Sequence, residues 1–257
     1  MNEKELINYY NKFNEDKRLN TKHGMIEFKT SIKYILDYLS KANSKVLDVG
    51  AGTGKYSLYL DSLGYDVTAV ELVKHNLKVL ESKESNVKCY QGNAMDLSKF
   101  KDNTFDMVLL FGPMYHLISM NEKVQSLKEA KRVVKPNGII MISYCMNEYA
   151  IITHGFIDNN IKDALNKQEI DDEYHIQSKP NELYSFVRLE DINYLKDTCE
   201  LNRVKIIAQD GPTEYIKKII NKMNDDELDL FFKYHLATCE REELLGASRH
   251  ILDILRK

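Results

Sequence analysis

Three glycines at alternating positions, Gly50, Gly52 and Gly54, follow a run of apolar residues and precede a helical pattern. Glycine suits a backbone that turns sharply and comes close to a ligand, because no Cβ is in the way. N–H groups at the start of the following helix would point at that ligand. A G-x-G-x-x-G loop would need its third glycine at Lys55 or Ser57. The spacing therefore disfavours a nicotinamide dinucleotide.

Two acidic residues accompany the glycines. Asp48 lies two positions before the first of them, where a carboxylate would repel a pyrophosphate but attract the ammonium group of an amino acid. Glu71 ends the next apolar run, and a carboxylate there can accept both hydroxyls of a ribose. The pair predicts an adenosyl amino acid as ligand. The alternatives are that Asp48 only caps the turn and that Glu71 is solvated.

A third polar segment follows the next predicted strand. Asn93 can accept a hydrogen bond from an adenine amino group, and Met95 can lie on the ring face, although methionine also serves as a core residue. We expect Ala51, Leu72 and Ala94 to line the same site. The ends of successive parallel strands meet in one crevice, which is where open α/β sheets bind ligands.

The elements that must position these residues alternate along the chain. Short β-rich runs are separated by helical patterns, which predicts a parallel sheet with helices on both faces. The predicted strands are 45–49, 66–71, 87–91, 105–111, 138–144, 204–209 and 249–256, and the predicted helices in the first half are 55–63, 73–83 and 121–134. Two further helical regions are expected within 147–200 and two helices within 213–243.

The segment 46–145 resembles the class I S-adenosylmethionine-dependent methyltransferases. Asp48–Gly54 is similar to their D-x-G-x-G-x-G loop, Glu71 to their ribose-binding acid, and 132–138 to their turn before the fifth strand. Asn93 stands where the family usually has aspartate. The resemblance implies a Rossmann-like open sheet of seven strands, mostly parallel with the last strand antiparallel. It also implies S-adenosylmethionine as cofactor and S-adenosylhomocysteine as product.

The flanking segments are similar to small bacterial enzymes of this family that act on small molecules. In the leader, Arg18 could meet the cofactor carboxylate and Tyr10 could pack over the cofactor, or the two could be a solvated arginine and a core tyrosine. We expect one methyltransferase domain over 1–257. It would comprise a helical cap (1–44), a cofactor-binding core (45–146) and two lid insertions (147–188 and 211–248).

The acceptor should lie near the segment after the fourth strand, which is similar to a G-P-L-Y-H-L motif of the same enzymes. Phe111 and Gly112 would flank the methionine part of the cofactor, and Tyr115 and His116 are the polar groups nearest the reacting centre. His116 could serve as a base, because its ordinary pKa lies near neutrality. Alternatively, it bonds a backbone carbonyl and orients the loop. Tyr115 would form a wall facing the acceptor.

Methyl transfer to a small molecule by in-line displacement is the predicted function. An RNA or other nucleic-acid methyltransferase and a non-catalytic S-adenosylmethionine-binding protein are the alternatives. The net charge of −3 disfavours nucleic acid as a partner. No metal-ligand spacing is present, and the absence of a signal peptide or long apolar run predicts a cytoplasmic protein away from membranes. Acidic residues outnumber basic ones in 147–200, which favours a cationic acceptor or simply a solvated face.

Overall fold

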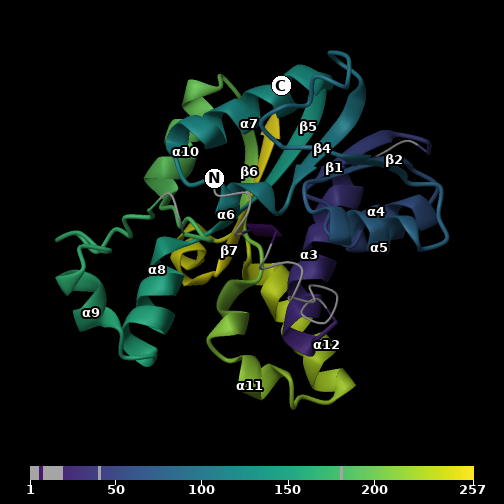
Figure 1. Ribbon diagram of the computed structural model, residues 1–257. Helices are drawn as coiled ribbons and strands as arrows, with labels where there is room; N and C mark the ends of the chain where they lie inside the picture. The colour runs from purple at the N-terminus through teal and green to yellow at the C-terminus, as the bar shows by residue number, and fades with distance from the viewer. Residues whose placement is uncertain (1–5, 8–19, 40–41, 180–181) are drawn as a thin grey trace.

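One seven-stranded sheet forms the centre of the molecule (Figure 1). The computed structural model describes residues 6–7, 20–39, 42–179 and 182–257. The strand order is β3-β2-β1-β4-β5-β7-β6, with β7 antiparallel to both neighbours and the other adjacent pairs parallel. This confirms the predicted Rossmann-like sheet. The strands are β1 (Lys45–Val49), β2 (Asp66–Glu71), β3 (Lys88–Gln91), β4 (Phe105–Leu110), β5 (Val134–Cys145), β6 (Asn202–Ala208) and β7 (His250–Arg256).

Helices connect most of the strands. Helices α7 and α10 lie side by side, whereas α11 and α12 pack against α3 (Figure 1). The α-helices are α3 (Lys22–Tyr38), α4 (Lys55–Ser62), α5 (Lys74–Glu81), α6 (Pro113–His116), α7 (Met120–Val133), α8 (Asn147–Ala150), α9 (Ile161–Asn166), α10 (Leu189–Thr198), α11 (Lys217–Ile220) and α12 (Asp225–Thr238). The described residues also form a π-helix, η1 (Ile151–Ile157), and two 3₁₀ helices, η2 (Gly211–Glu214) and η3 (Glu242–Ala247).

The inner strands are apolar on consecutive residues because helices or loops cover both faces of the sheet. Val46 and Leu47 of β1 and Leu109 of β4 are fully buried. Since β1 to β4 are parallel, the loops after all four strands leave the sheet at the same edge. That edge holds the segments singled out by the sequence.

Strand β5 begins earlier than the turn residues indicate. Proline and glycine in 135–138 predicted a turn and a strand start at Gly138, but Val134 already pairs with Phe105. The register then shifts before Met107, and Asn137 has a φ of 63°. A β-bulge or similar irregularity accommodates extra residues in one strand before pairing resumes. Asparagine tolerates the left-handed region better than most side chains, which allows Asn137 to adopt this φ.

No helix in the described part of the chain combines the length and apolar character needed to cross a membrane.

Candidate functional site

The glycine loop after β1 is built from three left-handed residues. Gly50, Gly52 and Gly54 have φ values of 77°, 56° and 90°. A Cβ on Gly54 would lie 2.2 Å from Leu80 Cδ1, so packing against α5 requires glycine there. A Cβ on Gly52 would meet no atom within 4 Å, because this residue faces open space. Gly52 therefore leaves room for a ligand rather than for the protein's own side chains.

The Glu71 side chain connects the end of β2 to this loop. Its Oε2 accepts a hydrogen bond from the Gly52 N–H at 2.8 Å, and its Oε1 accepts one from the Val73 N–H at 2.8 Å. Burial raises the pKa of Glu71, and these two backbone N–H groups oppose the rise. The carboxylate is thus fixed beside the open space next to Gly52.

Asp48 supplies a second buried carboxylate at the end of β1. Its Oδ2 accepts a hydrogen bond of 2.6 Å from the hydroxyl of Ser57 on α4. Burial raises the pKa of Asp48 to about 6, although the bonds from Ser57 act in the opposite direction. Asp48 and Glu71 both line one pocket. The two acids therefore lie close enough to hold different parts of one ligand.

The pocket contains most of the residues that the sequence indicated. It encloses about 1050 Å³, open solvent at its mouth included. Twelve predicted residues line it: Asp48, Gly50, Ala51, Gly52, Glu71, Leu72, Asn93, Ala94, Phe111, Gly112, Tyr115 and His116. Two others, Gly54 and Met95, are not among the lining residues; the Met95 N–H instead donates to Asn93 Oδ1 at 2.9 Å. Tyr10 and Arg18 lie outside the described residues.

Sequence reasoning missed several lining residues. They are Leu6, Glu27, Thr53, Lys55, Tyr56, Val73, Asn76, Gly92, Pro113 and Leu117. For Glu27 a signal was present: it lies three or four positions from Gly24 and Ser31, on the buried face of α3. A carboxylate on the buried face of a helix needs a partner or a function.

Short helix α6 brings Tyr115 and His116 into the pocket wall. The Tyr115 hydroxyl donates to the Phe111 carbonyl. His116 Nδ1 lies 2.8 Å from the Leu183 carbonyl oxygen. Burial lowers the pKa of His116 to about 4, although the bond to Leu183 acts in the opposite direction. The alternative role, in which His116 orients the loop, requires a bond of this kind to a backbone carbonyl. Catalytic roles for the two residues stay predictions.

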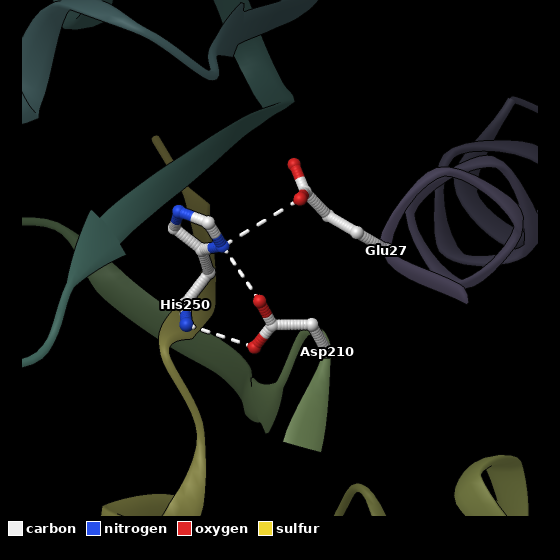
Figure 2. A group of neighbouring side chains, drawn as sticks. All are labelled: Glu27, Asp210 and His250. Carbon is white, nitrogen blue, oxygen red and sulfur yellow. Dashed lines mark hydrogen bonds and ion pairs between the residues drawn. The ribbon is translucent and has the colours of Figure 1, made fainter. Parts of the chain in front are cut away.

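A second polar cluster lies where α3 meets the ends of β6 and β7 (Figure 2). His250 Nδ1 is 2.7 Å from Asp210 Oδ2 and 3.6 Å from Glu27 Oε2. Burial alone would lower the pKa of His250, but Cys145, Asp210 and Glu27 raise it to about 10. Burial likewise opposes the ionisation of Asp210, but the charge and hydrogen bonds of His250 lower its pKa to about 2. His250 is therefore an imidazolium paired with an aspartate at neutral pH.

This ion pair predicts a stability that declines at alkaline pH. The folded pKa of His250 lies above the ordinary value of about 6.5, so the stabilisation is complete below that pH and is lost as pH rises toward 10. We expect the free energy of unfolding, from urea titrations, to fall more steeply in the wild type than in His250→Gln across this window. The difference should reach at most about 1.4 kcal/mol per pH unit. Parallel slopes would show that His250 does not hold its proton.

Comparison with known proteins agrees with the fold and the glycine loop. Residues 47–142 match the family model described as a methyltransferase domain. A demethylmenaquinone methyltransferase of Lysinibacillus sphaericus is 35% identical over 130 residues, covering 46% of this chain and 53% of the relative. The chain thus spans about half the length of the curated relatives it matches.

Solved structures extend the similarity of fold over most of the chain. A methyltransferase of Methanosarcina mazei has a TM-score of 0.58 and 18% identity, covering 87% of this chain and 96% of its own. A Thermotoga maritima methyltransferase, described as a possible histamine N-methyltransferase, has a TM-score of 0.61 and 16% identity, covering 97% of both chains. These matches assign residues 47–142 to a methyltransferase domain and show that the chain shares the fold of these solved structures.

Proposed function

We propose that the protein transfers the methyl group of S-adenosylmethionine to a small-molecule acceptor. One observation carries the proposal: Asp48, Glu71 and the open face of Gly52 share a single pocket at the carboxyl ends of β1 and β2. An adenosyl amino acid presents an ammonium group and two ribose hydroxyls, which buried carboxylates can bind.

The residues present fit this group. Asp48 would accept from the ammonium group, and Glu71 would accept from the ribose hydroxyls with the oxygen lone pairs that remain after its two backbone bonds. Leu72, Asn93 and Ala94 would surround the adenine, and Phe111 and Gly112 would adjoin the methionine part. When bound, the cofactor supplies a methyl carbon activated by a sulfonium.

The protein's own contribution would be position and shelter. Methyl transfer needs the acceptor atom held in line with the methyl group and kept from water. Tyr56 and Phe111 pack edge to face, with ring centroids 5.0 Å apart, and form part of an aromatic wall. The segments 1–44, 147–188 and 211–248 would cover the pocket as a cap and lids. A net charge of −3 supports a small acceptor over a nucleic acid.

Titration calorimetry with S-adenosylhomocysteine tests the cofactor part of the proposal. We expect micromolar binding, followed by methyl transfer from S-adenosylmethionine to at least one compound of a metabolite library. Absence of heat would refute the proposal. Binding without transfer to any compound in the library would instead favour a non-catalytic binder.

A further inference from the structure

A buried lysine that does not itself line the pocket contacts one part of the pocket wall. Lys123 lies in the first turn of α7 and is only 1% exposed. Its Nζ donates to the Met114 carbonyl at 2.7 Å and also to the Leu117 carbonyl. A lysine is rarely buried to this degree unless its ammonium has partners. The two carbonyls therefore identify the segment on which Lys123 acts.

That segment, residues 111–117, is a continuous part of the pocket wall. All of its residues except Met114 line the pocket. It contains α6, a helix of only four residues, in which the Leu117 N–H donates to the Pro113 carbonyl at 3.0 Å. So short a helix leaves most of its carbonyls without a partner inside the helix. Those carbonyls need donors from other parts of the chain.

The carbonyls of this segment receive donors from two separate elements. Lys123 serves two of them, and the Ser185 N–H donates to the Tyr115 carbonyl at 2.7 Å. The Leu183 carbonyl oxygen in turn lies 2.8 Å from His116 Nδ1. The part of the wall where the acceptor is expected is thus fixed both by α7 and by a later loop.

The other end of the segment is fixed by the glycine loop instead. A Cβ on Gly50 would lie 2.7 Å from Pro113 Cδ, and a Cβ on Gly112 would lie 3.3 Å from the Gly50 carbonyl oxygen. Such close packing leaves this end little freedom to move. Loss of Lys123 should therefore disturb the acceptor side of the pocket more than the cofactor side.

Lys123 is both anchored and charged. The start of α7 is capped, because the Ser119 side chain accepts from the Glu122 N–H at 3.2 Å and Glu122 Oε2 accepts from the Ser119 N–H at 3.0 Å. Burial lowers the pKa of Lys123 to about 8, although Glu122, Cys145 and Asp191 act in the opposite direction. Lys123 is therefore mostly an ammonium at pH 7, and an ammonium forms stronger hydrogen bonds than a neutral donor.

Building on the proposed methyl transfer, we infer that Lys123 is a positioning residue for the acceptor. By holding the carbonyls of Met114 and Leu117, it keeps the wall between them in the place that in-line transfer requires. A displacement of about 1 Å in such a wall can lower the rate about 100-fold. A lysine that only stabilised the fold would affect the cofactor and the acceptor alike.

The same helix offers a matched control. Lys131 is also in α7, and its Nζ donates to two backbone carbonyls, those of Cys199 at 2.8 Å and Glu200 at 3.2 Å. These two residues follow α10, and neither they nor Lys131 line the pocket. Lys123→Met and Lys131→Met each remove an ammonium from two carbonyls and keep a long, unbranched side chain.

Methyl transfer is measured with the acceptor that the metabolite library identifies. Rates are expressed per S-adenosylhomocysteine-binding site, so that unfolded protein does not count. We expect Lys123→Met to lose about 10- to 100-fold in kcat/KM for the acceptor, with S-adenosylhomocysteine affinity and the KM for S-adenosylmethionine changed by less than about twofold. Lys131→Met should retain wild-type values. Lys123→Gln, whose amide can still donate to a carbonyl, should lose at least about 3-fold but less than Lys123→Met.

Hydrogen exchange of the S-adenosylhomocysteine complex gives a second measurement that needs no acceptor. The Leu117 N–H bonds to the Pro113 carbonyl, and the Ser185 N–H bonds to the Tyr115 carbonyl. Both amides should exchange at least about 10-fold faster in Lys123→Met than in the wild type. Their exchange should be unchanged in Lys131→Met.

Three results would overturn the inference while leaving the proposed function intact. They are acceptor turnover of Lys123→Met within about twofold of the wild type, an equal loss of turnover in Lys131→Met, and an equal loss of S-adenosylhomocysteine affinity in Lys123→Met. If Lys123→Met does not fold, turnover of Lys123→Gln within about twofold of the wild type has the same meaning. Failure of the wild type to bind S-adenosylhomocysteine or to transfer a methyl group would instead defeat the proposed function, and with it the inference that rests on it.

Discussion

Replacing Gly52 with valine should abolish S-adenosylhomocysteine binding while leaving the protein folded. A Cβ at this position enters open space in the pocket, with no protein atom within 4 Å, so the new side chain would occupy the ligand's volume. We expect the affinity measured by calorimetry to fall by at least about 100-fold, which corresponds to about 2.7 kcal/mol.

Gly64→Val is the matched control for this prediction. Gly64 lies between α4 and β2, has a φ of 86°, and a Cβ added there would likewise meet no atom within 4 Å. Both variants place a β-branched residue in the left-handed region, which costs about 1–2 kcal/mol of folding free energy. Similar losses of stability, with only Gly52→Val losing affinity, would isolate the effect in the pocket. Normal binding by folded Gly52→Val would contradict the proposed cofactor site.

Glu71→Gln should weaken binding by about 10- to 100-fold, because a charged acceptor for the ribose hydroxyls is lost. The substitution also has a structural consequence. The two Glu71 oxygens accept from the N–H groups of Gly52 and Val73, so the amide NH₂ of glutamine would face one of those donors. We therefore expect the free energy of unfolding to fall by about 1–3 kcal/mol as well.

Glu227→Gln is the control that separates the loss of affinity from the loss of stability. Glu227 Oε2 also accepts a backbone N–H, that of Asn224 at 2.8 Å, at the start of α12. It does not line the pocket. Calorimetry should show reduced affinity for Glu71→Gln alone. Urea unfolding of both variants measures the loss of stability separately. If Glu71→Gln bound S-adenosylhomocysteine as tightly as the wild type, its assigned contact with the ribose would be wrong.

Local patterns in the sequence were enough to predict the sheet and many of the residues that line the pocket. Consecutive apolar residues identify strands buried on both faces, and the glycine spacing marks a turn that stays open to a ligand. Because parallel strands end at one edge, Asp48 and Glu71 could be expected in one crevice, and both line the pocket. The early start of β5 escaped prediction because Asn137 adopts φ 63° and pairing continues through the segment that contains it.

Only the tertiary structure decided what surrounds the rest of the pocket. Strand order inserts β7 between β5 and β6, which brings His250 beside Asp210 and within 5.7 Å of the Tyr115 ring centroid. Helix α3 then adds Glu27 from the far end of the sequence. Periodicity reports which face of an element is buried, but not which distant element covers that face. The pairing of an acid in α3 with an imidazole in β7 therefore depended on the packing of the whole chain.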